Sequence, residues 1–299
     1  MKRLVALLAL AFASPARAGD PVHVLTVGGA RIEVVLRGGP FDLGDAGVLA
    51  WVDAAARAVT AYYDGFPLAR ARIAIHGFDG AGVRGGTARG DGGPAIDVGV
   101  GRESTRDQLT RDWVLTHEMV HLVFPSLARR HHWMEEGLAT YVEPLGRVRA
   151  GDLAETKVWE DLVDGLPQGL PRDGDRGLDF TPTWGRTYWG GALFWLVADV
   201  AIRERTGNRK GLEHALRAIA AAGGTIETPW TIDKVIAVGD AATGVPVLRE
   251  TYDRMKDRPA PVDLDELWRR LGVRRGGGRI SFDPDAPLAA VRRAIGTGR

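Results

Sequence analysis

The five residues HEMVH at 117 to 121 constrain this chain more than any other stretch. Positions i and i+4 of an α-helix lie on one face, so a helix here aims His117 and His121 at a common point. Two converging imidazoles form half of a zinc site, and Glu118 lies beside the metal position, where a carboxylate can take a proton from water. The motif therefore predicts a helix with hydrolase chemistry. The alternative is an amphipathic core helix with two partly buried histidines.

A third ligand is expected from the next helix, because a catalytic zinc normally keeps three protein ligands and one open position. Pro125 stops the first helix, and a short loop leads to a second helix at 133 to 145, WMEEGLATYVEPL. Two helices joined so closely pack antiparallel, which brings the start of the second to the middle of the first. We expect Glu136 to reach the metal, because Gly137 beside it allows close backbone approach. Glu135 is the alternative, and a solvated first turn is the ordinary use of such a pair.

These two motifs resemble those of the gluzincin metallopeptidases, the superfamily of thermolysin, aminopeptidase N and the glycyl aminopeptidases. In that superfamily HExxH is followed by a Glu in a W-x-x-E-G-x-A-x-Y helix, and WMEEGLATY matches every fixed position. The resemblance implies that His117, His121 and Glu136 bind one Zn²⁺ ion and that Glu118 is the general base. It covers roughly residues 106 to 200 and implies a thermolysin-like helical region there.

A further stretch, GRTYWGGALFWLVADV at 185 to 200, resembles the Y-x-x-G-A helix of the aminopeptidase N-like enzymes. The resemblance implies that Tyr188 donates a hydrogen bond to the oxyanion of the tetrahedral intermediate. A phenol is neutral at pH 7 and suits that role. The alternative is a core tyrosine packed among Trp184, Trp189 and Trp195.

The segment GVRGGTARGDGGPAIDVGV at 82 to 100 departs from the aminopeptidase pattern. Those enzymes carry a Glu here that binds the free amino group of the substrate, whereas this segment has none, so Asp91 or Asp97 would have to replace it. Gly85 and Gly86 would let a peptide backbone lie along an edge strand. The other interpretation is a mobile polar loop.

The first residues, MKRLVALLALAFASPARA, have the basic start, short apolar run and small-residue ending of a cleaved secretory signal at 1 to 18. We expect cleavage after Ala18 and a periplasmic or secreted protein; an uncleaved anchor is the alternative. The chain has no cysteine, so its stability must come from its core. A net charge of +1 argues against nucleic acid or a membrane surface as partner.

The periodicity predicts an α+β fold, with a small mixed sheet and one helix first and helices after it. We expect an N-terminal α+β part at 19 to 103, a zinc-binding helical part at 104 to 224 and a helical C-terminal region at 225 to 299. In the first part we expect a hairpin at 22 to 36, a helix at 46 to 63, and strands at 71 to 78 and 95 to 100. Helices are expected at 105 to 124, 133 to 145, 150 to 164, 186 to 206, 208 to 222, 246 to 257 and 263 to 271.

The connecting segments carry a few further candidates. The Gly- and Pro-rich stretch 165 to 185 is expected to be a loop over the cleft mouth, and RRGGGR at 274 to 279 a solvated linker. His131 and His132 lie in a loop, where histidines are usually solvated but can contact substrate. Arg186 would bind a substrate carboxylate or form a structural ion pair.

The sequence favours a secreted zinc metallopeptidase that acts on a peptide or protein substrate. One rival is a non-catalytic exported scaffold that keeps the metal for structure, which a fourth protein ligand would favour. Another is a zinc hydrolase with a non-peptide substrate, because zinc chemistry does not choose the substrate.

Overall fold

The computed structural model describes residues 21–298. The expected signal segment at 1 to 18 lies outside this range. The chain folds as α+β, with a mixed sheet first and a largely helical region after it, as predicted. No helix within the described range combines the length and apolarity needed to cross a bilayer.

Five strands form the N-terminal sheet in the order β1-β2-β3-β5-β4. β1 and β2 form the predicted antiparallel hairpin around Gly28 and Gly29, which both have positive φ. β2, β3 and β5 run parallel, and β4 pairs antiparallel with β5 at the edge. The segment at 82 to 100 therefore contains an edge strand rather than only a polar loop. The strands are β1 (Val22–Val27), β2 (Ala30–Arg37), β3 (Arg70–Phe78), β4 (Val83–Arg89) and β5 (Ala95–Gly101).

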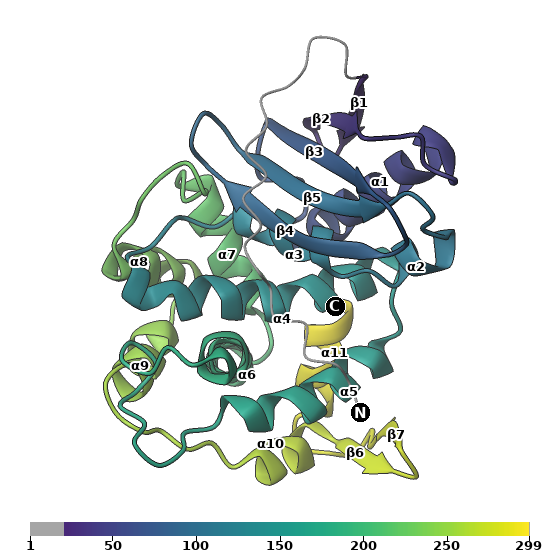
Figure 1. Cartoon of the computed structure of the whole chain (residues 1–299). Helices are drawn as coiled ribbons and strands as arrows, with labels where there is room; N and C mark the ends of the chain where they lie inside the picture. The colour runs from purple at the N-terminus through teal and green to yellow at the C-terminus, as the bar shows by residue number, and fades with distance from the viewer. Residues whose placement is uncertain (1–20, 299) are drawn as a thin grey trace.

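Alternation along the strands sends one side of the sheet into the core. Ile73 and Ile75 of β3 and Ile96 and Val98 of β5 are fully buried, and they point to the same face because they are two residues apart on paired strands. Figure 1 shows α3 and α4 beneath the sheet, with α6 and α9 farther from it. The zinc-motif helix therefore packs directly under the edge strand β4.

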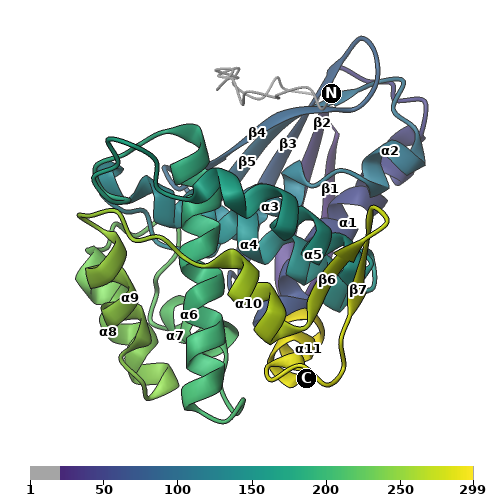
Figure 2. The same ribbon diagram turned by 90° about the horizontal axis from the view of Figure 1, so that it is seen from below.

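The helical region follows the predicted order, and most predicted helices are found within a few residues. Figure 2 shows α8 and α9 on one side of the molecule and α10, α11 and a small hairpin on the other. The helices are α1 (Gly44–Tyr63), α2 (Arg106–Thr110), α3 (Val114–Leu122), α4 (His132–Ala150), α5 (Glu155–Gly165), α6 (Gly191–Arg205), α7 (Leu212–Ala221), α8 (Ile232–Thr243), α9 (Val247–Met255), α10 (Leu264–Leu271) and α11 (Ala289–Thr297).

The single helix predicted at 105 to 124 is wrong, because α2 and α3 are separate. Thr105 and Gln108 form a capping box that starts α2. The Asp112 carboxylate accepts a hydrogen bond from the Leu115 amide at 3.3 Å, so a new helix starts beside it.

The linker expected at 274 to 279 is also wrong. β6 (Val273–Gly276) and β7 (Arg279–Phe282) form an antiparallel hairpin there. Gly277 and Gly278 both have positive φ, which suits a two-residue turn. The helices α8 and α11 were not among those expected from periodicity.

Candidate metal centre

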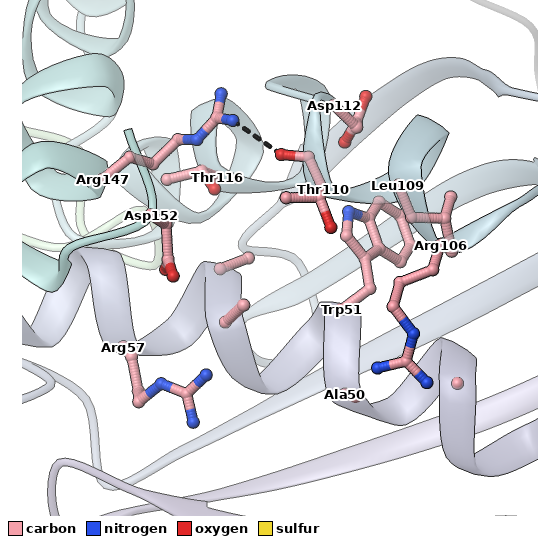
Figure 3. A pocket seen from close by; sticks show the side chains of 13 residues that line it. Ala50, Trp51, Arg57, Arg106, Leu109, Thr110, Asp112, Thr116, Arg147 and Asp152 are labelled. Atoms are coloured by element: carbon pink, nitrogen blue, oxygen red, sulfur yellow. Dashed lines mark hydrogen bonds between the residues drawn. The ribbon is translucent and has the colours of Figure 1, made fainter. Parts of the chain in front are cut away.

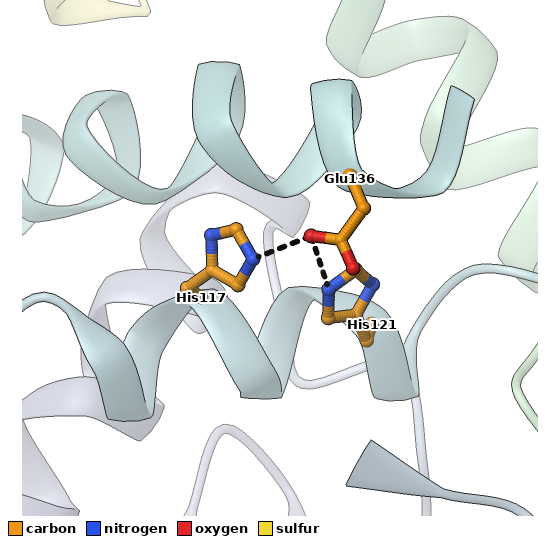
Figure 4. Close-up of side chains that lie close together, drawn as sticks. All are labelled: His117, His121 and Glu136. Carbon is orange, nitrogen blue, oxygen red and sulfur yellow. Dashed lines mark hydrogen bonds and ion pairs between the residues drawn. The ribbon is translucent and has the colours of Figure 1, made fainter. Parts of the chain in front are cut away.

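Side chains from α3 and α4 converge between the two helices. The Nε2 atom of His117 lies 3.2 Å and that of His121 3.6 Å from one oxygen, Oε2, of Glu136. Figure 4 shows this carboxylate between the two imidazole rings. The three side chains place one ligand atom each within 4.8 Å of one another, the arrangement expected of a metal site. Within residues 21–298, no other group of three or more such side chains has this spacing.

The spacing of these atoms can be compared with that of a zinc site. Metal–ligand bonds of about 2.1 Å at tetrahedral angles put neighbouring donor atoms about 3.4 Å apart. The two nitrogen–oxygen distances, 3.2 and 3.6 Å, lie on either side of that value. Two imidazole nitrogens and one carboxylate oxygen are also a donor set that zinc accepts. The residues therefore fit the metal in both chemistry and spacing.

Charge within the cluster perturbs the protonation of its members. Burial alone would raise the pKa of Glu136, but the charge of His121 and hydrogen bonds from His117, His121 and His132 hold it well below its usual range. Burial would lower the pKa of His121, but Glu136 outweighs it and raises the pKa to about 9. The cluster thus keeps Glu136 ionised, as a ligand must be.

Glu118 lies beside the cluster, where its charge acts on both His121 and Tyr188, and it also contacts the edge strand β4. Its Oε2 atom accepts a hydrogen bond of 2.9 Å from the Ala88 amide. At Gly86 there is no room for a side chain, because an added Cβ would lie 2.4 Å from Cγ of Glu118. The strand irregularity between Arg84 and Gly86 accompanies this close approach. The sequence predicts Gly86 in an edge strand, but no local pattern indicates its contact with Glu118.

Tyr188 lies in a single π-helical turn, Arg186–Gly190, which leads into α6. Such turns insert one residue into a helix and often occur at functional sites. The Tyr188 ring stacks 6.5 Å from that of His117, so it faces the cluster rather than the core. Burial, followed by the charge of Glu136, raises its pKa above the ordinary value and keeps the hydroxyl protonated. Tyr188 is only partly buried and its ring contacts that of exposed Trp184, so it lies at the edge of the core.

Glu135 is held in a different position from Glu136. Its Oε1 atom accepts a hydrogen bond from the Leu127 amide at 2.9 Å, and its Oε2 atom lies 3.1 Å from Nδ1 of His132. His132 also lies 3.2 Å from Oε1 of Glu136 through its Nε2 atom. The hydrogen bonds that His132 donates to Glu135 and Glu136 raise the pKa of His132 to about 10. His132 therefore holds Oε1 of Glu136, while Oε2 is the oxygen near His117 and His121.

The remaining candidates lie away from the cluster. His131 is buried, against the expectation for a loop histidine, and its Nδ1 atom lies 3.0 Å from Asp179. Arg186 is buried and forms a 2.8 Å ion pair with Asp175. Of the two roles expected for Arg186, this favours the structural ion pair over a contact with a substrate carboxylate. Asp91 is exposed in the turn after β4. Asp97 pairs with His76 at 2.6 Å, on the sheet face opposite to the one that meets Glu118.

A separate cavity of about 230 Å³ lies between α1, α2 and the start of α3. Figure 3 shows Trp51 and the carboxylate of Asp112 among its lining side chains, with Arg57, Arg106 and Arg147 around them. Burial raises the pKa of Asp112 to about 6. Thr116, next to His117 in sequence, lines this cavity, so the zinc-motif helix separates it from the cluster.

Comparisons with known proteins place the fold. No family model matches the chain, and no curated protein matches its sequence. An aminopeptidase N family protein from Idiomarina loihiensis is similar in structure, with a TM-score of 0.60 and 15% identity over 85% of this chain and 49% of that one. An M1 zinc metallopeptidase variant bound to L-arginine gives a TM-score of 0.51 and 16% identity over 81% and 54%.

A third similar structure is an M1 zinc metallopeptidase variant from Deinococcus radiodurans, described as bound to a Tyr-Ser-Ala substrate. Its TM-score is 0.51, with 14% identity over 81% of this chain and 53% of that one. This chain thus spans about half the length of the structures it resembles. At these identities the likeness shows a shared fold with M1 zinc metallopeptidases.

Proposed function

We propose that this protein is a zinc-dependent metallopeptidase that hydrolyses peptide bonds. The observation that carries the proposal is the convergence of His117, His121 and Glu136 at zinc-like spacing, with Glu118 beside them. The fold, shared with M1 zinc metallopeptidases, supports the same chemistry. A three-membered donor set also favours a catalytic over a structural zinc, which usually has four protein ligands.

When bound, a single zinc ion would supply Lewis-acid activation of a water molecule and of the scissile carbonyl. Glu118 accepts a proton from the attacking water and later passes it to the leaving amine. The Ala88 amide holds one oxygen of Glu118 in place for this exchange. Tyr188, protonated at neutral pH, donates a hydrogen bond to the oxyanion that forms at the carbonyl.

The substrate we propose is a peptide, in line with one similar structure, which is described with a bound Tyr-Ser-Ala substrate. The edge strand β4 supports this choice, because an extended peptide can add to such an edge. Export, with removal of residues 1 to 18, is also part of the proposal and rests on the composition of that segment.

Substitution of Glu118 tests the proposed function. The Glu118→Gln variant keeps the shape of the side chain but cannot accept a proton, so we expect kcat on a peptide library to fall by about 10³-fold or more. Zinc content, measured by plasma mass spectrometry, should equal that of the parent, because the three ligands are unchanged. Undiminished cleavage by this variant would refute the mechanism.

A further inference from the structure

Exposed tryptophan side chains stand next to the metal centre. Few large apolar side chains are well exposed within residues 21–298, and two of them are Trp113 at 40% and Trp184 at 48%. Trp113 directly precedes α3, and Trp184 precedes the π-helical turn that holds Tyr188. A single exposed apolar side chain is ordinary, but here two of them contact rings of the same proposed metal centre. The two tryptophans are therefore placed to meet a ligand.

The two tryptophans extend a row of rings that runs through the centre. Trp184 lies 5.6 Å from Tyr188 between ring centroids, and Tyr188 lies 6.5 Å from His117. Trp113 also meets the His117 ring, edge to face, at 5.4 Å. Tyr188 is the proposed oxyanion donor and His117 a proposed metal ligand. The two tryptophans each contact one of these rings and are themselves exposed.

The spacing of this row matches the spacing of side chains in an extended peptide. A strand advances about 3.3 Å per residue, so the residues on either side of a scissile bond lie within about 7 Å of its carbonyl. Trp184 lies 5.6 Å from the ring of the proposed oxyanion donor Tyr188, and Trp113 lies 5.4 Å from the ring of the proposed metal ligand His117. Both indoles are therefore within about two residues of an extended peptide whose scissile carbonyl lies at the centre.

We propose that Trp113 and Trp184 form a specificity surface that selects peptides with a large apolar or aromatic residue next to the scissile bond. The inference rests on the proposed peptidase function and deepens it by naming the substrate class. An indole offers a wide apolar face and stacks on aromatic rings, whereas that face gives no compensation to a desolvated carboxylate. Small or acidic residues at the same positions would gain little from it.

Binding to the zinc-loaded Glu118→Gln protein tests this surface without depending on cleavage. The ligands are peptides that differ only in a central pair of residues, Phe-Phe, Leu-Leu, Ala-Ala or Glu-Glu, and affinity is measured by calorimetry. We expect the Phe-Phe and Leu-Leu peptides to bind roughly tenfold more tightly than the other two. Adding Trp113→Ala or Trp184→Ala should cut this preference to about twofold, and Trp→Phe at either position should keep most of it.

A matched control is Val24→Ala on β1, at the sheet edge opposite β4. Val24 is exposed to the same 48% as Trp184, and its removal should leave the preference unchanged. Circular dichroism and zinc content check that each variant folds. The inference is overturned if both tryptophan variants keep the full preference for Phe-Phe and Leu-Leu peptides. It is also overturned if the Glu118→Gln protein with both tryptophans intact shows no such preference. Failure of the parent enzyme to cleave any peptide would instead count against the proposed function, while the binding preference still decides the role of the two tryptophans.

Discussion

At the scale of single residues, the position of Glu118 depends on the absence of a side chain at Gly86. Gly86 has no Cβ, and the space that a Cβ would occupy is filled by the side chain of Glu118. The same strand donates the Ala88 amide to Glu118, so β4 both makes room for the proposed base and orients it. Neither contact involves His117, His121 or Glu136. Metal binding and proton transfer are therefore separable by mutation.

Gly86→Ala should impair catalysis while leaving metal binding intact. The added methyl group pushes Glu118 off the Ala88 amide, and a displacement of about 1 Å can cost about 100-fold in rate. We expect kcat on a peptide substrate to fall by that order, with unchanged zinc content. Gly276→Ala is the matched control, because this strand glycine has open space around it. Wild-type kcat in the Gly86 variant would contradict the positioning role of β4.

Asp112 is a second residue whose surroundings have a measurable consequence. Burial raises its pKa to about 6 from the ordinary 3.8, against opposing hydrogen bonds from the Leu115 and Val114 amides. The folded protein therefore holds this proton more tightly than the unfolded chain. The stability that the protonated Asp112 side chain contributes is fully present below pH 4, and it is lost as the pH rises through about 6.

Asp112→Asn removes this titration. Relative to the variant, the parent should lose about 2–3 kcal/mol of unfolding free energy between pH 4 and pH 7. Urea unfolding of both proteins across that range measures the difference. Asp152→Asn, which replaces an exposed carboxylate lining the same cavity, controls for surface charge. A difference that stays constant with pH would show that Asp112 does not titrate as described.

At the scale of elements, the crossing of α4 and α6 sets the distance between Glu136 and Tyr188. A Cβ at Gly137 would lie 2.2 Å from the backbone carbonyl carbon of Gly191, and one at Gly191 would lie 2.1 Å from the carbonyl oxygen of Trp133. The two helices therefore touch through their backbones. This explains why Gly137 follows Glu136, since a side chain there would separate the proposed ligand from the proposed oxyanion donor.

Gly137→Ala should destabilise the protein, because backbone atoms cannot move aside as a flexible side chain can. We expect a loss of about 2–3 kcal/mol in unfolding free energy, seen as a lower thermal midpoint. Gly296→Ala in α11 is the matched control. The methyl group there meets the movable carboxyl end of Glu155 at 3.0 Å, so the helix-propensity gain should offset most of the cost. Equal midpoints for the two variants would argue against a tight crossing.

At the scale of the whole molecule, the proposed ligands connect α3, which packs under the sheet, with α4, which packs on α3. α3 contributes the two histidines and α4 the carboxylate, and α4 also packs on α1 and α6. A metal that binds all three side chains would stabilise this arrangement, because the unfolded chain does not preserve it. The chain has no cysteine, so disulfides cannot supply that restraint.

Metal removal should therefore lower the thermal stability. At a free zinc concentration about 100 times the Kd, binding adds about 2.7 kcal/mol, which corresponds to several degrees in the midpoint. Thermal unfolding followed by circular dichroism, with zinc or with a chelator, measures the shift. His117→Ala should show little response to zinc. If the thermal midpoint of the unsubstituted protein is the same with zinc and with the chelator, the cluster binds no metal.

The sequence alone determined what depends on neighbours a few residues apart. Helical spacing was enough to put His117 and His121 on one face, and alternation was enough to predict the hairpin and the α+β order. Periodicity did not predict the break between helices at Asp112 or the hairpin at Gly277 and Gly278, because helix caps and short turns have no periodic pattern.

Only the tertiary structure decided which groups meet across the chain. The choice between Glu135 and Glu136 depends on how α4 is rotated against α3, and adjacent residues differ by about 100° around a helix. The Ala88 amide reaches Glu118 across 30 positions through the register of β4 on β5. The exposure of Trp113 and Trp184 likewise follows from packing. Local patterns carry no information about such contacts, because helix packing and strand register fix them.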